Sequence, residues 1–315
     1  MEQITPNVHS LHVKLDWFPQ PYPPNVHLVI DGNEGALIDS GFSDDDSLAR
    51  RLEMLKEFPG LQLRYIIVTH HHFDHASGAN KLRAATGPDG PLSGDARIVI
   101  HRDEAPLLQR AATEQMPDDV DLPPEAQVYR ERVQEWRNEA AQGTPDQTVA
   151  DGDTLTVGNL TLRMVHTPGH TAGHLTPFLE QGKVLFAGDN VLGMGTTAIP
   201  PPPHGNMAQY VESLRKMQSL EADVLCCGHG PAVNEANRKL QELIDHRGER
   251  EEQILSLARE GRDTVKALVR AIYPELDKRI LGMAAGQVIS HLAKLRDEGR
   301  VRTTGEGDEM KIEVG

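Results

Sequence analysis

The sequence predicts an α/β protein with a second, smaller domain at its C-terminal end. Short apolar runs alternate with amphipathic helical patterns over most of the chain, and four of these runs lead directly into loops that carry histidine or aspartate. Toward the C-terminus the pattern changes to helices followed by two short strands. We therefore expect one domain over residues 1–245 and another over residues 250–315.

The first predicted elements are a hairpin, a helix and a strand. Two apolar runs on either side of an Asp-Gly turn predict a hairpin over residues 26–38. Residues 43–58 place leucines at helical spacing behind Ser43 or Asp44, and either side chain is suited to cap a helix. An apolar strand follows at residues 65–68.

The middle of the chain holds an acidic, proline-containing stretch at residues 113–147 around one predicted helix at residues 125–142. We interpret this stretch as an insertion, for which a lid is one use. Strands resume at residues 154–157, 160–165 and 184–186, and glycines separate them.

The remaining elements are mainly helical. A helix beginning at Asn206 carries Met207, Tyr210, Val211, Leu214 and Met217 on one face. Then come a strand at residues 223–227, a helical pattern at 234–260, a helix at 263–273, a second helix after Pro274, and short strands at 300–304 and 310–314. Helices followed by such a hairpin are typical of a winged helix.

Composition narrows the class of protein. The net charge of −15 disfavours non-specific binding of nucleic acid by the whole chain. The first residues carry no basic stretch followed by an apolar run, and no segment approaches the roughly 18 apolar residues of a membrane helix. The two cysteines are adjacent, a geometry that rarely allows a disulfide. We expect a cytoplasmic protein with reduced thiols and no membrane contact.

Candidate metal ligands lie where four apolar strands end. These strands lead into loops that contain, in order, His70, His72, Asp74 and His75, then His170, then Asp189, and finally His229. Side chains at strand ends converge at one edge of a sheet. Imidazole and carboxylate suit zinc and also iron or manganese, so these seven residues predict a metal site.

The spacing His70-x-His72-x-Asp74-His75 favours two metal ions rather than one. A compact loop can direct alternate residues at one ion and the later pair at a second ion, with Asp189 placed to bridge them. Two divalent cations, most simply Zn²⁺, would lower the pKa of a shared water to about 7. We therefore predict a metal-dependent hydrolase.

The residues from Thr69 to His75, together with Thr167-Pro-Gly-His170-Thr, Gly188-Asp189 and Gly228-His229-Gly230, resemble the metallo-β-lactamase superfamily. The C-terminal winged-helix pattern and Cys227-Gly-His-Gly-Pro231 are similar to the group around beta-lactamase-like protein 2, in which some members are endoribonucleases. The resemblance spans almost the whole chain apart from residues 113–147.

The resemblance implies an αββα sandwich with two metals at one sheet edge. It assigns His70, His72 and His170 to the first metal, Asp74, His75 and His229 to the second, and Asp189 to a bridge between them. Because Asp189 is present, the chain resembles the glyoxalase II, lactonase and nuclease branches more than the zinc β-lactamases. We therefore do not expect β-lactamase activity.

Three further residues are candidates for supporting the ligands or contacting substrate. Asp39 ends a strand and resembles the superfamily's buried aspartate that supports the ligand loop. His174 follows His170 by four residues, and Tyr210 is a candidate contact to substrate. Among the other histidines, we expect His71 to point away from the ligands and His166 to be an ordinary strand residue.

Three functions compete at this point. The first is hydrolysis of a small thioester, lactone or other ester by a metal-bridging hydroxide, with Asp74 orienting that hydroxide as a catalytic residue. The second is a single-strand endoribonuclease or phosphodiesterase. The third is a winged-helix nucleic-acid-binding protein that carries an inert metal domain. A small molecule is the expected substrate, and RNA and a second copy of the chain remain candidate partners.

Overall fold

A computed structural model describes residues 1–13, 23–87, 90–113, 124–277 and 280–315, without the side chains of residues 124–129. The chain forms two compact units. The first contains Met1–His166, Gly173–Gly195 and Ala222–Asn234, and the second contains Thr167–Ala172, Thr196–Glu221 and Glu235–Gly315. The expected domain boundary near residues 245–250 stays a prediction.

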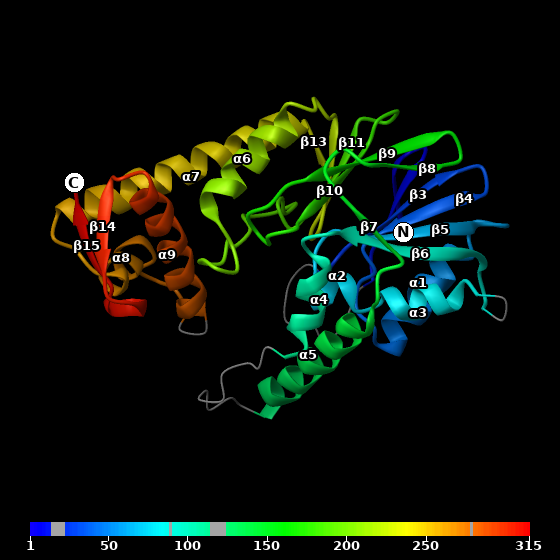
Figure 1. The fold of residues 1–315 in the computed structure, drawn as a ribbon, viewed down its shortest axis with the longest axis horizontal. Helices are drawn as coiled ribbons and strands as arrows, with labels where there is room; N and C mark the ends of the chain where they lie inside the picture. Colours follow the sequence, from blue (N-terminus) through cyan, green and yellow to red (C-terminus); the bar gives the residue numbers. More distant parts are fainter. Residues whose placement is uncertain (14–22, 88–89, 114–123, 278–279) are drawn as a thin grey trace. The chain divides into compact units, whose positions relative to one another are not determined.

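The first unit is built on two β-sheets (Figure 1). Within the described residues, one sheet has seven strands in sequential order: β1 (Glu2–Thr5), β2 (Val8–Leu11), β3 (Val26–Asp31), β4 (Glu34–Ile38), β5 (Gln62–Val68), β6 (Ser93–His101) and β7 (Gln147–Val149). The other, counted over the same residues, has six in the order β13 (Val233–Asn234), β12 (Val224–Cys227), β11 (Val184–Gly188), β10 (Leu175–Leu179), β9 (Leu160–His166) and β8 (Thr154–Val157).

The directions of the strands bring several carboxyl ends to one edge. In the first sheet, β1 to β4 pair antiparallel, as the predicted hairpin requires, whereas β4 to β7 pair parallel. In the second sheet β11 and β12 are parallel and the other pairs are antiparallel. Parallel neighbours end on the same side, so the loops after β4 and β5, and those after β11 and β12, are brought together in pairs.

Two apolar clusters stabilise this unit. One lies between the sheets and joins side chains such as Val29 and Ile67 of the first sheet to Leu162 and Phe186 of the second. The other joins the opposite face of the first sheet to helices (Figure 1). These helices are α1 (Asp45–Leu55), α2 (Phe73–Ala76), α3 (Ala79–Ala85), α4 (Ala105–Ala111) and α5 (Pro124–Gln142). The arrangement gives a helix–sheet–sheet order within the unit.

Local sequence explains where the predicted helices begin. The Asp44 side chain accepts a hydrogen bond from the Ser47 amide at 2.9 Å, which caps α1 and satisfies one of its free N–H groups. The predicted helix at residues 125–142 corresponds to α5. The rest of the insertion that precedes it, residues 114–123, lies outside the described residues, so the lid stays a prediction.

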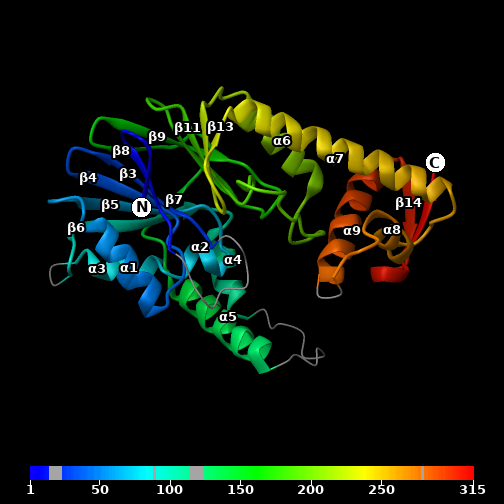
Figure 2. The ribbon, with the colours of Figure 1, turned by 180° about the vertical axis from the view of Figure 1, so that it is seen from behind.

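The second unit consists of helices and a C-terminal hairpin, seen from both sides in Figures 1 and 2. Its elements are α6 (Met207–Gln218), α7 (Ala236–Arg259), α8 (Val265–Ile272), α9 (Leu281–Asp297), β14 (Val301–Thr304) and β15 (Lys311–Val314). α8, α9 and the hairpin share an apolar core with the end of α7. Each of these elements was predicted from apolar spacing, and each prediction is confirmed.

A buried carboxylate in this unit contacts two basic side chains of α9. The Glu251 side chain is 6% exposed and accepts a hydrogen bond from Lys294 Nζ at 2.9 Å, while His291 Nδ1 lies 3.6 Å from its other oxygen. The positive charge of Lys294 on α9 is thus partly neutralised by a buried carboxylate. Among the described helices, none is long and apolar enough to cross a membrane.

Candidate metal centre

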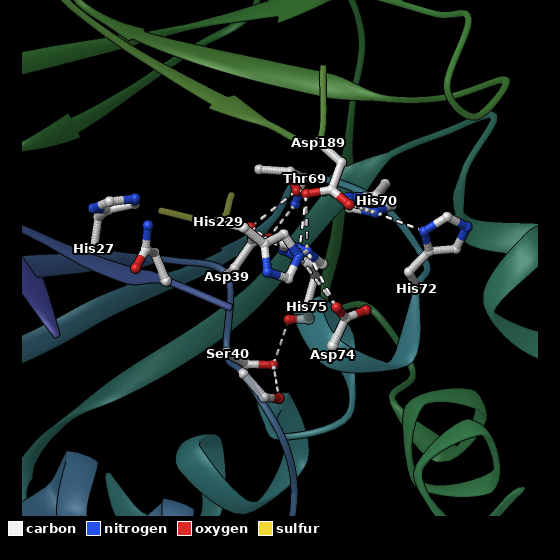
Figure 3. A network of polar contacts seen from close by, with 12 residues as sticks. His27, Asp39, Ser40, Thr69, His70, His72, Asp74, His75, Asp189 and His229 are labelled. Atoms are coloured by element: carbon white, nitrogen blue, oxygen red, sulfur yellow. Dashed lines mark hydrogen bonds and ion pairs between the residues drawn. The ribbon is translucent and has the colours of Figure 1, made fainter. Parts of the chain in front are cut away.

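The predicted ligands of the first unit meet at the edge where strands β4, β5, β11 and β12 end (Figure 3). The loop after β5 carries four of them, and α2 begins inside that loop at Phe73. Asp189 directly follows β11, and His229 comes two residues after β12. Six of the residues named as candidate ligands, from three loops, therefore lie close together, and their role as metal ligands stays a prediction.

The ligand atoms of His70, His72 and Asp189 form one group, in which they lie within 4.8 Å of one another. His70 Nε2 is 3.0 Å from His72 Nδ1. The His70 ring is fully buried, and Asp189 Oδ2 lies 3.9 Å from its Nε2.

The ligand atoms of Asp74, His75 and His229 form a second group, in which they also lie within 4.8 Å of one another. The Nε2 atoms of His75 and His229 are 3.3 Å apart. Asp74 Oδ2 lies 3.3 Å from the same atom of His229 and 3.8 Å from that of His75.

Asp189 stands between the two groups and presents one oxygen to each. Its Oδ1 is 3.3 Å from His75 Nε2 and 3.5 Å from His229 Nε2, whereas its Oδ2 is the atom that faces His70 (Figure 3). A carboxylate placed in this way has the geometry of a bridging ligand.

Asp39 and Thr69 hold the far sides of two imidazoles (Figure 3). Asp39 Oδ2 is 2.8 Å from His75 Nδ1, and its Oδ1 accepts the Thr69 amide at 2.8 Å. The Thr69 hydroxyl, 3.0 Å from Asp39 Oδ2, also lies 3.0 Å from His70 Nδ1. With both Nδ1 atoms engaged, the Nε2 atoms are directed toward the centre, as metal-binding histidines require.

The donor set and its spacing fit divalent metal ions. Two nitrogens bound to one tetrahedral ion at about 2.1 Å each lie roughly 3.4 Å apart. The separations of 3.0 Å between His70 and His72 and 3.3 Å between His75 and His229 are close to that value. Imidazole and carboxylate together are typical ligands of zinc, iron and manganese.

The histidine pKa shifts within the second group also favour a bound cation. Burial lowers the pKa of His75, but the carboxylates of Asp189, Asp39 and Asp74 outweigh burial and raise this pKa well above its ordinary value. Burial likewise lowers the pKa of His229, and Asp189 and Asp74 again raise it. Carboxylates packed this densely attract positive charge, which a divalent cation supplies while displacing the protons.

Two glycines leave room for these contacts. A Cβ on Gly188, whose φ is +47°, would lie 2.7 Å from His174 Nε2 and 2.8 Å from Thr69 Oγ1. A Cβ on Gly228 would lie 2.3 Å from Asp189 Oδ1. Any larger residue at these strand ends would displace the ligands or their supports.

The other predicted site residues have different surroundings. His170 belongs to the second unit, where its Nδ1 is 3.0 Å from the Ala198 carbonyl, so its place in the first group stays a prediction. His174 is buried, lies 3.0 Å from the Asn190 amide nitrogen and stacks on His70 at 5.2 Å between ring centroids. Tyr210 is buried in the second unit beneath the Arg247 guanidinium, and its contact to substrate stays a prediction.

His71 and His166 each have a partner other than the residues of the two groups above. His71 Nδ1 is 2.5 Å from Glu104 Oε1. His166 stacks on His101, with centroids 4.0 Å apart and planes 9° apart. His101, His166 and Asp103 have ligand atoms within 4.8 Å of one another. However, imidazole lone pairs lie in the ring planes, so two parallel rings do not converge on one ion.

Sequence reasoning missed two residues that support the ligand loops. Asn25 donates to the carbonyls of Cys227 and Gly230, at 3.0 and 2.7 Å, and thereby fixes the loop around His229. Glu104 accepts a hydrogen bond from the His71 amide at 2.8 Å and thereby fixes the loop that contains His71. Neither belongs to a ligand motif. Asn25 directly precedes the predicted strand at residues 26–30, whereas no element was predicted around Glu104, so the sequence contains no signal for it.

Comparison with known proteins identifies the family. The family described as "Metallo-beta-lactamase superfamily" matches residues 19–229, and the "Beta-lactamase associated winged helix domain" matches residues 264–309. The Beta-lactamase-like protein 2 homolog of Drosophila melanogaster is 28% identical over 289 residues, covering 90% of this chain and 86% of that protein. An Atrochrysone carboxyl ACP thioesterase of Aspergillus fumigatus is 35% identical over 146 residues, 45% of each chain.

Solved structures confirm the predicted fold class. A metallo-beta-lactamase family protein from Thermus thermophilus has a TM-score of 0.71 at 24% identity, covering 99% of this chain and 100% of its own. A beta-lactamase domain protein from Burkholderia ambifaria has a TM-score of 0.78 at 22% identity, covering 99% and 93%. The chain therefore belongs to the metallo-β-lactamase superfamily of hydrolases and carries the associated winged-helix domain.

Proposed function

We propose that this enzyme hydrolyses a small thioester, lactone or other ester at a centre of two divalent metal ions. The observation that carries the proposal is the position of Asp189, whose two carboxylate oxygens each face a separate group of ligands. A mononuclear site would have no use for the second group.

In this proposal His70, His72 and His170 hold the first ion, Asp74, His75 and His229 hold the second, and Asp189 contacts both. Zinc is the simplest occupant, and the ligand types leave iron and manganese open. Bound ions would supply a nucleophilic hydroxide near neutral pH and positive charge for the departing oxyanion or thiolate.

Asp74 is the proposed catalytic residue because it is an ionised acceptor at the centre. Burial raises the pKa of its carboxyl, but His75 and His229 outweigh burial and hold that pKa below its ordinary value. An ionised Asp74 accepts a hydrogen bond from the nucleophile and directs the nucleophile's free lone pair at the substrate. No side-chain nucleophile takes part in this scheme.

Two observations support an ester or thioester over a nucleic acid. A relative is named as a thioesterase, although it is similar over only 45% of this chain. The net charge of −15 opposes the approach of a polyanion and has little effect on an uncharged acyl group.

The test combines metal analysis with a substrate panel. Protein purified without added metal is expected to contain about two equivalents of transition metal and to turn over a thioester, lactone or ester in the panel. Asp74→Ala should lower kcat/KM by at least about a hundredfold. Active protein that contains no transition metal would contradict the proposal.

Cleavage of single-stranded RNA is the second candidate, and the winged-helix match at residues 264–309 favours it. Metal-dependent cleavage of an oligoribonucleotide without turnover of any acyl substrate would establish it instead. If wild type hydrolyses nothing in the panel and Asp74→Ala leaves nucleic-acid binding unchanged, the centre is inert and the chain is a binding protein.

A further inference from the structure

Glu104 is a buried carboxylate that holds the first ligand loop without being a predicted ligand itself. It lies just beyond β6, which ends at His101, and its side chain is fully buried. Its Oε1 accepts the His71 backbone amide at 2.8 Å and lies 2.5 Å from His71 Nδ1. Its Oε2 accepts the Gly173 amide at 2.8 Å. One side chain therefore connects three segments that are distant in sequence.

The position of His71 explains why this contact matters. His71 lies between His70 and His72, whose ring nitrogens face each other at 3.0 Å. Anchoring both the amide and the ring of His71 on one side leaves its two neighbours turned to the other side. Glu104 thus fixes the peptide plane between His70 and His71 and, with the His71 ring, the part of the loop that carries two of the proposed ligands of the first metal.

The contacts require a carboxylate rather than an amide. All three partners donate, and only an acceptor-only group satisfies donors on both of its oxygens. Burial raises the pKa of Glu104, but hydrogen bonds from His71 outweigh burial and hold this pKa below its ordinary value. A glutamine has the same size but would turn an NH₂ group toward one of the donors, at either orientation of its amide.

Gly173 is built to meet Glu104. A Cβ at Gly173 would lie 2.4 Å from the Glu104 amide nitrogen, so the turn approaches Glu104 more closely than a side chain allows. Gly173 comes three residues after His170 in the chain. The same carboxylate therefore anchors the connection that leads from His170 back to β10.

We propose that Glu104 is a positioning residue that sets the affinity of the first metal group by fixing His71 between the ligands His70 and His72. The inference rests on the proposed dinuclear centre. Asp39 contacts His75 of the second group directly and reaches His70 of the first group through Thr69. The hydrogen bonds of Glu104 described above go to His71 and Gly173, so we assign its effect to the first group.

The test measures metal affinity in the full-length chain with Glu104→Gln. Zn²⁺ is titrated in competition with a chromogenic chelator, and Co²⁺ substitution reports the coordination of each ion by its visible absorption. We expect one of the two equivalents to bind about 10- to 100-fold more weakly, as is usual when a support of a metal ligand is removed. The other equivalent should change less than about threefold.

Glu251→Gln is the matched control. It replaces another buried glutamate by the same isostere, in the second unit, where Glu251 contacts Lys294 and His291. We expect it to lower thermal stability and to leave both metal equivalents unchanged. Loss of metal from this control to the same extent as from Glu104→Gln would overturn the inference, because both effects would then reflect stability alone.

Substitutions of His71 separate positioning from general packing. The amide nitrogen of asparagine is as many bonds from the backbone as Nδ1 of histidine, so His71→Asn keeps a donor for Glu104, whereas His71→Leu does not. We expect His71→Asn to retain most of the affinity and His71→Leu to lose it as Glu104→Gln does. Equal affinities for the two variants would contradict the inference.

The outcomes for the inference and for the proposed function are distinguishable. Wild type that binds fewer than two equivalents contradicts the dinuclear centre itself. Wild type that binds two equivalents, together with Glu104→Gln that keeps both at wild-type affinity, overturns the inference alone.

Discussion

At the scale of single residues, the centre depends on what lies behind each imidazole. His75 and His70 reach the centre through Nε2 because Asp39 and Thr69 occupy their Nδ1 atoms. Asp39 itself has a φ of 63°, a backbone conformation that aspartate and asparagine tolerate better than other non-glycine residues. Its carboxylate therefore cannot be exchanged for most other side chains without changing both the backbone and the tautomer of His75.

Asp39→Asn tests this dependence because asparagine keeps the backbone conformation and one acceptor oxygen. Its NH₂ group would face either Thr69 or His75, and we expect metal affinity to fall about 10- to 100-fold and stability to fall by about 1–3 kcal/mol. Chelator competition and urea denaturation measure the two effects. Asp44→Asn is the control, since asparagine caps a helix as well as aspartate does. Equal behaviour of both variants would show that Asp39 has no special role.

His27 should make the protein sensitive to acid. Its ring is buried, with Nε2 3.1 Å from the Cys227 carbonyl, and burial lowers its pKa to about 4. The unfolded chain has a pKa near 6.5 at this residue. Between these values the unfolded state binds a proton that the folded state does not, so stability falls as pH drops from about 6.5 toward 4.

His27→Gln removes this titration and keeps a donor for the carbonyl. Between pH 7 and pH 5 the free energy of unfolding of the wild type should fall by about 2 kcal/mol more than that of the variant, at about 1.4 kcal/mol for each pH unit below 6.5. Urea denaturation at the two pH values measures the difference. Identical losses in both proteins would mean that His27 takes up its proton as readily in the folded chain as in the unfolded chain.

At the scale of elements, the insertion helix α5 supports the ligand loop. Trp136 is 3% exposed and packs against Phe42, with centroids 4.5 Å apart, and against Phe73, at 5.8 Å with planes 12° apart. Phe73 is the residue between the proposed ligands His72 and Asp74. Packing of α5 is thereby coupled to the loop.

Trp136→Ala should therefore affect both stability and metal binding. Removal of a buried tryptophan costs about 3–5 kcal/mol, and the loosened Phe73 should weaken metal affinity. Thermal denaturation and chelator competition measure the two effects, with Glu135→Ala, on the exposed side of the helix, as the control. Full metal affinity in a strongly destabilised Trp136→Ala would show that α5 stabilises the fold without supporting the loop.

Elements with strong apolar spacing could be predicted from the sequence, whereas others could not. Helices α6 to α9 were predicted because their apolar periodicity is regular, and the two hairpins because short strands flank turn residues. Strand β10 was missed, and its central Pro177 shows why such a strand is hard to predict. The structure accommodates this proline because β10 pairs with β11 only through Phe178 and Leu179.

At the scale of the whole molecule, the motif residues predicted contacts between distant parts of the chain, which the pattern of helices and strands did not predict. Ligands separated by more than 150 residues, such as His75 and His229, were predicted to meet, and their Nε2 atoms are 3.3 Å apart. The supports Asn25 and Glu104 were not predicted, because they act through backbone groups that leave no spacing in the sequence. The periodicity of the sequence also does not indicate that Thr167–Ala172 and Thr196–Glu221, from the middle of the chain, belong to the second unit.

The charge of the whole molecule distinguishes the two candidate substrate classes. An uncharged thioester or lactone has no long-range electrostatic interaction with a protein of net charge −15, so salt has nothing to screen. We therefore expect its kcat/KM to change by less than about twofold between about 50 and 200 mM salt. Binding of an oligoribonucleotide through several phosphates would instead weaken by about 10³-fold or more over the same range. Steady-state kinetics and fluorescence anisotropy across a salt series measure the two responses. Tight RNA binding with a steep salt dependence would mean that a local basic surface overcomes the overall charge, and it would move the proposed substrate from an acyl ester to a phosphodiester.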